Sequence, residues 1–402
     1  MHGRNSVRDC VAAGTGAKQS FAACQVHKTP SMSQPPIRIS AVSVFPVRIP
    51  VRAVHSHGIG DIAASTNVIL RLDTDAGITG WGEAAPWTVF TGSPEASAAA
   101  LDVHLRPLLL GADPFRIEAL MAMANRSVVH CTEAKAAMEM ALFDIAGKAL
   151  GIPVCDLLGG RVRDEIPLSF SVANPDFAQD ADLVHQLCAD GIRLFKVKTG
   201  FAEHADDLRR LSMLRNLLPD DAEIRVDYNQ GMQPWDAIRR LRDIEQFRPT
   251  FIEQPVPADQ RALLAAITAA LDTPVMADEC VFTPEDALLV ASRHIADLIS
   301  IKVQKAGGML RAREISAIAA AGGLACYGGD MCETGIASTA GTHMIAATAN
   351  ISLGCEFYQP NYYLAEDLLA QPFLVRNGKV QVPDGPGLGI KVDEDRLRRY
   401  AA

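Results

Sequence analysis

Five ionisable residues recur at nearly even spacing through the middle of this sequence, each at the end of a short apolar stretch. They are Lys198, Asp227, Glu253, Asp278 and Lys302. If the fold gathers the three carboxylates, they will repel one another and raise each other's pKa unless a cation neutralises them. Hard oxygen ligands that leave room for water and substrate suit Mg²⁺, or Mn²⁺ in its place. The spacing therefore predicts a divalent metal site built from Asp227, Glu253 and Asp278.

Lysines stand on both sides of this carboxylate triad. Lys196 and Lys198 should share one face of a strand, because strand side chains repeat every two residues. Two neighbouring ammonium groups lower each other's pKa, which makes a lysine a usable base near neutral pH. Lys302 lies beyond the triad in the chain. This arrangement predicts proton transfer at opposite faces of a bound carbon acid, rather than lysines that only pair with the carboxylates.

Two neighbours of the triad have different expected orientations. Asn229 comes two residues after Asp227, so it should face the same way and either contact substrate or support the residues that hold the metal. Glu279 directly follows Asp278 and should point to the opposite face, which favours a structural role.

Short strands that alternate with helices should position these residues. From Glu165 onward, the pattern predicts strands at 166–172, 194–198, 224–229, 250–254, 275–279, 298–303, 324–328 and 351–357. Helical segments such as 205–218 and 235–247 lie between nearly every pair. Eight repeats favour a closed (β/α)8-type barrel over a doubly wound sheet, because no G-x-G-x-x-G follows the first strand. In a barrel the ionisable strand ends would meet at one mouth.

Other segments flank the predicted barrel, which we place at 161–365. Residues 37–160 combine strand-like alternation up to about Gly82 with helical periodicity from about Ser93 to Leu150, which predicts an α+β unit. The last barrel helix is replaced by 364–369 and a Pro/Gly-rich tail. We expect the segment 366–402 to pack back on the first unit.

Composition excludes several classes of function. Of 402 residues, 38 are Lys or Arg and 47 are Asp or Glu, and the formal charge of −9 argues against nucleic-acid and membrane partners. The nine cysteines include no C-x-x-C pair, which predicts neither a disulfide framework nor a zinc site and favours the cytoplasm. Residues 1–36 lack the apolar core of a signal peptide. We therefore expect a disordered or non-native extension there, with a transit peptide as the alternative.

Several motifs together give the chain a family resemblance. It resembles the enolase superfamily, and within it the muconate lactonizing enzyme (muconate cycloisomerase) subgroup, over residues 37–395. The motifs are Lys196-Val197-Lys198, Arg225-Val226-Asp227-Tyr228-Asn229-Gln230, Phe251-Ile252-Glu253-Gln254-Pro255, Met276-Ala277-Asp278-Glu279, Ile301-Lys302 with Gly307-Gly308, and Tyr327-Gly328-Gly329-Asp330-Met331-Cys332-Glu333.

The resemblance implies an N-terminal α+β capping domain over a modified (β/α)7β TIM-type barrel, in a homo-oligomer. A small-molecule carboxylate substrate would coordinate Mg²⁺ or Mn²⁺, and the metal would stabilise an enolate. In cycloisomerases the residue that matches Lys198 moves the α-proton, and in racemases Lys198 and Lys302 would act from opposite faces. Glu333 matches a position that lines the substrate site in the subgroup. We also expect Lys196 to contact substrate.

Two further regions bear on the substrate. The loop 52–60 should fold over the barrel mouth, where Arg52, His55 and His57 would meet a second carboxylate, as muconate requires. Asp330 stands where lactonizing enzymes typically have an uncharged residue, and its charge would fit a cationic nitrogen. Trp87 and Phe90 would supply an aromatic wall to such a group.

The first prediction is therefore a metal-dependent cycloisomerase of cis,cis-muconate or a related carboxylate. The alternative is a racemase or epimerase of an N-substituted amino acid, a dipeptide or a betaine, which would use the same lysines. A dehydration of the o-succinylbenzoate type is a third option. A catalytically silent scaffold would require a broken triad or broken lysines, and none is broken.

Overall fold

The computed structural model describes residues 37–402, so the prediction for residues 1–36 lies outside it. Eight parallel strands form one sheet in chain order: β5 (Ser169–Val172), β6 (Leu194–Lys198), β7 (Glu223–Asp227), β8 (Ile252–Glu253), β9 (Val275–Ala277), β10 (Leu298–Ile301), β11 (Ala325–Gly328) and β12 (Ile351–Cys355). A parallel bridge from Leu168 to Cys355 joins the first strand to the last. The sheet therefore closes into the predicted barrel.

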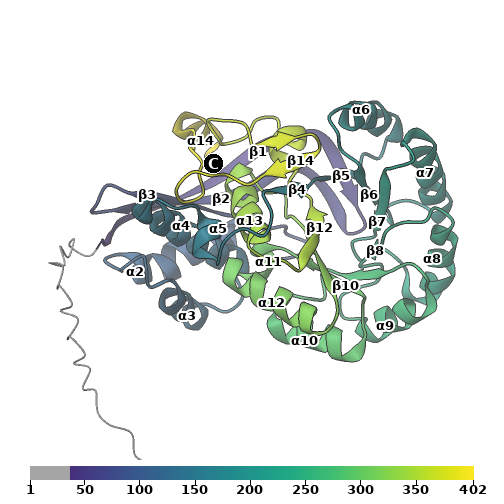
Figure 1. Cartoon of the computed structure of the whole chain (residues 1–402), viewed down its shortest axis with the longest axis horizontal. Helices are drawn as coiled ribbons and strands as arrows, with labels where there is room; N and C mark the ends of the chain where they lie inside the picture. The colour runs from purple at the N-terminus through teal and green to yellow at the C-terminus, as the bar shows by residue number, and fades with distance from the viewer. Residues whose placement is uncertain (1–36) are drawn as a thin grey trace, which may run out of the picture. The chain divides into compact units, whose positions relative to one another are not determined.

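Helices connect consecutive strands and cover the outside of the barrel, as Figure 1 shows for α6 to α10. They are α6 (Phe177–Ala189), α7 (His204–Leu217), α8 (Ala237–Glu245), α9 (Arg261–Ala270), α10 (Pro284–Arg293), the pair α11 (Val303–Ala306) and α12 (Met309–Ala321), and α13 (Gly335–Ala346). Leu211 and Leu214 of α7 are fully buried, since a three-residue spacing keeps them on the inner face. The π-helix η3 (Gln359–Tyr363) follows β12. The modified (β/α)7β architecture is confirmed.

The first predicted strand is split in two by the structure. Its beginning is β4 (Glu165–Pro167), which leaves the barrel and pairs with β14 (Lys379–Gln381) of the C-terminal segment. β14 pairs in turn with β13 (Val375–Arg376). The sequence pattern of 166–172 could not reveal this division, because the partner that attracts β4 lies far along the chain.

The N-terminal domain has the predicted α+β composition. β1 (Ile39–His57), β2 (Gly60–Thr74) and β3 (Thr79–Ala84) form an antiparallel sheet, followed by α1 (Pro94–Ala99), η1 (Ala100–Leu105), α2 (Arg106–Leu109), α3 (Ile117–Ser127), α4 (Thr132–Leu150) and α5 (Val154–Leu157). Helix α4 packs tightly on β3. A Cβ atom at Gly82 would lie 1.9 Å from the Ala137 carbonyl oxygen, so this close approach requires glycine.

The C-terminal segment packs on the N-terminal domain through several contacts, of which two concern β1 and α4. Ala401, just after α14 (Glu394–Tyr400), bridges Val47 of β1. The Leu388 N–H donates a 2.8 Å hydrogen bond to the buried Asp144 carboxylate of α4. No helix within residues 37–402 is long and apolar enough to cross a membrane.

A buried glutamate ties the capping domain to the barrel, and we predict its effect on stability. Glu139 of α4 accepts hydrogen bonds from the N–H groups of Met309 and Leu310 at the start of α12. The variant Glu139→Ala leaves the buried Met309 N–H and the half-buried Leu310 N–H without this acceptor, at a cost of about 1–3 kcal/mol for the buried donor and less for the other. Urea denaturation should show a lower free energy of unfolding. An unchanged free energy would contradict the role of this contact.

Candidate functional site

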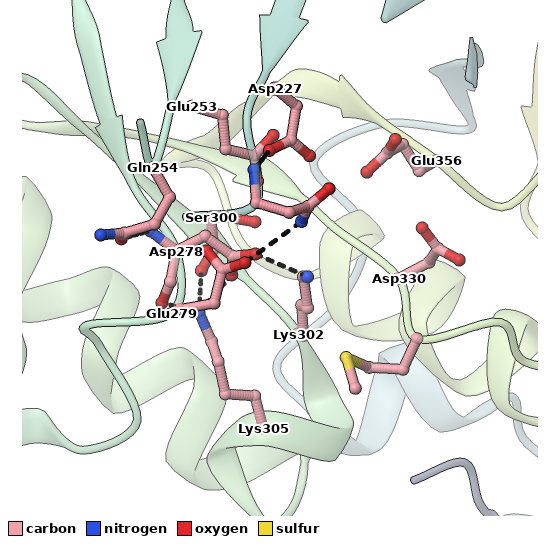
Figure 2. A network of polar contacts seen from close by, with 12 residues as sticks. Asp227, Glu253, Gln254, Asp278, Glu279, Ser300, Lys302, Lys305, Asp330 and Glu356 are labelled. Atoms are coloured by element: carbon pink, nitrogen blue, oxygen red, sulfur yellow. Dashed lines mark hydrogen bonds and ion pairs between the residues drawn. The ribbon is translucent and has the colours of Figure 1, made fainter. Parts of the chain in front are cut away.

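The five evenly spaced residues come together at the C-terminal ends of neighbouring strands. Lys198 pairs with Asp227 in the β6–β7 register, and Asp227 pairs with Glu253 in the β7–β8 register. Asp278 directly follows β9, and Lys302 directly follows β10. All five side chains are buried. Figure 2 shows Asp227 beside Glu253, with Asp278 near them and Lys302 approaching Asp278.

The two predicted proton-transfer lysines pair with two of the three carboxylates. Lys198 Nζ lies 2.7 Å from Asp227 Oδ2, and Lys302 Nζ lies 2.7 Å from Asp278 Oδ2. Lys305, which the sequence analysis missed, lies with its Nζ 2.7 Å from Asp278 Oδ1. Burial alone would raise the pKa of Asp278, but the ammonium groups of Lys302 and Lys305 outweigh it and lower that pKa to about 2. Each of the two predicted proton-transfer lysines is thus held by a different carboxylate.

Lys196 lies beneath the pocket rather than on its wall. Its Nζ is 2.6 Å from Glu356 Oε2, 2.7 Å from Glu253 Oε2 and 3.1 Å from Asp227 Oδ2. Burial acts to lower the pKa of Lys196, but these carboxylates outweigh it and raise the pKa well above its ordinary value. The predicted lowering of the lysine pKa therefore does not hold for Lys196, because these carboxylates outweigh any repulsion from Lys198. Lys196 is not among the residues that line the pocket, and its contacts with three anions make it a balance for their charge.

Asn229 and Glu279 both lie in the site. The Asn229 side chain accepts a 3.1 Å hydrogen bond from Lys198 and donates one of 3.1 Å to Glu279 Oε1. The expectation that Glu279 points away fails, because β9 ends at Ala277 and strand alternation does not extend to it. Burial and the neighbouring Asp278 raise the pKa of Glu279 to about 8.

A pocket lies above the lysines, closed from the capping side by the β1–β2 hairpin. Its walls include Lys198, Lys302, Asn229, His55, His57, Trp87, Asp330, Glu356, Tyr358 and Gln359. Burial, and to a smaller extent the positive charge of the nearby Lys198, lowers the pKa of His55 to about 3, so this imidazole is neutral. Arg52 donates instead to the Leu364 carbonyl oxygen and does not line this pocket.

Of the two acidic residues predicted to contact substrate, Asp330 lines the pocket and Glu333 does not. Asp330 lines the pocket and accepts hydrogen bonds from the Cys332 N–H and the Gln359 side chain. Burial, reinforced by Glu356, raises the pKa of Asp330 to about 6. Glu333 does not line the pocket, because its carboxylate turns back to accept from the Met331 N–H.

Glu356 is a pocket residue that the sequence analysis missed. It directly follows β12, and it accepts hydrogen bonds from Lys196 and from the Ser171 hydroxyl at 2.8 Å. Figure 2 shows it near Asp330 on one side of the site. The strand-end rule that identified Asp227 applies equally to the predicted strand 351–357, where Glu356 is the last residue but one. Trp87 lines the pocket as predicted, whereas the Phe90 ring lies 5.0 Å from Lys302 Nζ.

The chemistry of the donor set fits a divalent cation. Within residues 37–402, no three His, Cys, Asp or Glu side chains already stand in a metal-binding arrangement, and lysines hold oxygens of Asp227 and Asp278. Glu253 is fully buried, yet its Oε1 has no hydrogen-bond partner. Burial, and to a smaller extent the negative charge of Asp227, raises the pKa of Glu253 to about 8. An oxygen without a donor beside two other carboxylates is what a hard cation would satisfy.

Comparisons with known proteins assign the family. Residues 39–159 match the mandelate racemase / muconate lactonizing enzyme N-terminal domain, and residues 179–396 match the enolase C-terminal domain-like model. The chain belongs to the muconate lactonizing enzyme subgroup of the enolase superfamily. Within this subgroup, muconate cycloisomerase 1 of Pseudomonas putida is 34% identical over 371 residues, which cover 90% of this chain and 98% of that protein.

Two further members of this subgroup differ in the activity that their names state. The L-Ala-D/L-Glu epimerase of Bacillus subtilis is 34% identical over 358 residues, covering 88% of this chain and 97% of that protein. The crystal structure of a muconate cycloisomerase from Azorhizobium caulinodans superposes with a TM-score of 0.79 at 47% identity, covering 91% of this chain and 98% of that one. This protein is thus an enzyme of a subgroup that holds both cycloisomerases and epimerases.

Proposed function

We propose that this enzyme transfers a proton at the α-carbon of a small carboxylate, with Lys198 and Lys302 as the acid–base pair. The supporting observation is that both ammonium groups line one pocket while separate carboxylates, Asp227 and Asp278, hold them. Two bases anchored to different strands can reach a flat, enolate-like carbon from its two faces. Lysine at such a position contributes about 10²- to 10⁴-fold to a proton-transfer rate.

Asp227, Glu253 and Asp278 would hold Mg²⁺ or Mn²⁺. When bound, such a cation stabilises the negative charge that develops on the substrate carboxylate as the α-proton leaves. Lys196 offsets part of the charge of the three carboxylates from below. The neutral His55 and His57 close the pocket and exclude water from the reacting carbon.

The first candidate reaction is the cycloisomerisation of cis,cis-muconate or a related carboxylate. Relatives named muconate cycloisomerase support it, at 34% identity for the Pseudomonas putida protein and 47% for the Azorhizobium caulinodans structure. In the lactone-forming direction, Lys198 would deliver the proton to the α-carbon after the distal carboxylate has attacked the double bond. His57, Tyr358 and Gln359 are uncharged pocket residues that could contact that distal carboxylate.

A second candidate is the epimerisation of an N-substituted amino acid, a dipeptide or a betaine. The specific observation in its favour is that two carboxylates, Asp330 and Glu356, line the same pocket. Such a wall suits a cationic nitrogen better than a second carboxylate. In this reaction one lysine would remove the α-proton and the other would return a proton from the opposite face.

Proton NMR in D₂O with Mg²⁺ or Mn²⁺ distinguishes the two candidates. The substrate panel contains muconate, N-acyl amino acids, dipeptides and proline betaines. Conversion of muconate to a lactone with deuterium at the α-carbon supports the cycloisomerase. Deuterium entering an amino-acid derivative that is otherwise unchanged supports the epimerase. No deuterium uptake and no turnover across the panel would argue against proton transfer to this class of compound.

Removing Lys302 gives a prediction about the faces of the substrate. In Lys302→Ala, Lys198 remains in the pocket, held by Asp227. We expect α-proton exchange to persist for the enantiomer whose proton faces Lys198 and to fall by about 10²-fold or more for the other enantiomer. NMR exchange rates of the two separated enantiomers of an accepted N-acyl amino acid measure this difference. Equal loss for both enantiomers would contradict the two-face geometry.

A further inference from the structure

A single buried residue of the capping domain contacts two active-site loops at once. Glu83, near the end of β3, is fully buried. Its carboxylate accepts hydrogen bonds from the Thr334 N–H at 2.8 Å, the Thr334 hydroxyl at 2.7 Å and the Ala337 N–H at 2.9 Å. Asn67 donates a fourth, at 2.7 Å. All four partners are donors, which suits a carboxylate, a group that only accepts when ionised.

These contacts fix the loop between β11 and α13. Thr334 is the N-cap of α13, so the Glu83 carboxylate stands at a helix N-terminus and stabilises it. The same loop is held a second time from β2, where Ser65 and Asn67 donate to the Cys332 carbonyl oxygen at 3.0 Å and 3.2 Å. Because Asp330 belongs to this loop, its place in the pocket depends on an anchor that lies outside the pocket.

The backbone of Glu83 contacts the second active-site segment, the short helix α11 that follows Lys302. Its carbonyl oxygen accepts a 3.0 Å hydrogen bond from the Gln304 side chain, and the Ala85 N–H donates to the same amide at 3.2 Å. Gln304 is fully buried in α11, whose N-cap is Lys302. On the barrel side, Lys305 of the same helix donates to Asp278 and to the Ser300 carbonyl oxygen. The short helix that follows Lys302 is therefore fastened from both domains.

We infer that Glu83 is a positioning residue that sets the geometry of Lys302 and of the 330–334 loop together. The catalytic consequence of this inference rests on the proposed function. The physical coupling of the two segments does not depend on that function. Glu83 touches neither substrate nor the reacting atoms: its carboxylate acts on Thr334 and its backbone carbonyl oxygen acts on Gln304, so residue 83 links the two segments through its own backbone. Lys198 stands on β6, which Glu83 does not contact.

The test uses Glu83→Gln in the full-length enzyme. The amide keeps the shape but replaces one acceptor oxygen with a donor, which would face the N–H or hydroxyl donors of the α13 N-terminus. The carboxylate does not touch Gln304, so the effect on α11 must pass through the backbone: a side chain displaced from the α13 N-terminus shifts residue 83, whose carbonyl oxygen holds Gln304. Hydrogen–deuterium exchange followed by mass spectrometry should then show faster amide exchange in 303–306 and in 330–337 together. This readout needs no substrate, so it decides the coupling even if the proposed reaction is wrong. Faster exchange confined to 330–337 would overturn the inference.

Kinetics separate positioning from a general loss of stability. A displaced catalytic group can cost up to 10²-fold, so we expect exchange on the Lys302 face to fall about tenfold or more in Glu83→Gln. Exchange on the Lys198 face should stay within about twofold, because Glu83 has no contact with β6. Equal loss on both faces would overturn the inference.

Two companion variants serve as controls. Glu139→Gln alters another buried capping-domain glutamate at a barrel-helix N-terminus, that of α12, and should destabilise the protein without a face-dependent rate change. Gln304→Met removes the link to α11 but leaves the Glu83–Thr334 contacts, so it should reproduce the loss on the Lys302 face with 330–337 unchanged. A face-dependent loss in Glu139→Gln, or none in Gln304→Met, would contradict the assignment to Glu83 and Gln304.

Discussion

Replacing Lys198 with alanine should abolish turnover while the fold survives. The ammonium group lines the pocket, and a positioned acid–base group contributes about 10²- to 10⁴-fold to the rate. Stability should change little, because Asp227 keeps its contact with Lys196 at 3.1 Å and is not left as an unpaired buried charge. The NMR assay measures the rate, and circular dichroism with thermal melting checks the fold.

Lys148→Ala is a matched control for this variant. Lys148 also pairs with a buried carboxylate, Asp144, but it lies in α4 outside the site. Asp144 would retain its hydrogen bonds from Trp81 and Leu388. Because Asp144 loses its lysine partner, whereas Asp227 keeps Lys196, we expect a larger fall in melting temperature than in Lys198→Ala, with turnover preserved. Turnover retained in Lys198→Ala, in a folded protein, would remove Lys198 from the mechanism.

Replacing Asp278 with asparagine should weaken Mg²⁺ binding by about tenfold or more, which corresponds to a loss of about 1.4 kcal/mol of binding free energy. The amide keeps the size of the side chain but removes one of three charges that would hold the cation. Lys302 and Lys305 also lose their shared anion, and removing one partner of a buried pair costs about 3–5 kcal/mol of stability. Isothermal titration calorimetry measures the affinity on protein shown to be folded.

Glu253→Gln provides the same test with a smaller effect on the fold. Lys196 would still contact Asp227 and Glu356, so no lysine is left without an anion. This variant should also lose Mg²⁺ affinity, whereas Glu139→Gln, remote from the triad, should not. Unchanged affinity in both Asp278→Asn and Glu253→Gln would refute the proposed metal site.

The sequence predicted the barrel and the meeting of the five ionisable residues because both follow from one periodic pattern. A βα repeat fixes the position of each strand end, and parallel strands bring equivalent ends to one rim. The predicted strand 194–198 agrees with β6 at both ends. Periodicity holds for Lys198, Asp227 and Glu253 because each is the last residue of its strand.

The prediction failed where side chains lie outside regular strands or depend on distant partners. Glu279 follows β9, so alternation along the strand could not give its direction. The raised pKa of Lys196 depends first on Glu253 and then on Glu356, a residue 160 positions further along the chain. Arg52 was expected in the pocket, but its guanidinium donates a hydrogen bond to the Leu364 carbonyl oxygen instead. Each of these outcomes is decided by tertiary contacts that have no signature in local sequence.

The bridge between Ala401 and Val47 has a consequence for folding during synthesis. Strand β1 emerges from the ribosome long before its partner at Ala401 and before the Leu388 N–H that meets Asp144. At 5–20 residues per second, the 354 positions from 47 to 401 delay this pairing by roughly 20 to 70 seconds. During this interval one strand edge and one buried carboxylate of the capping domain stay incompletely paired, until the residues up to 401 have been synthesised.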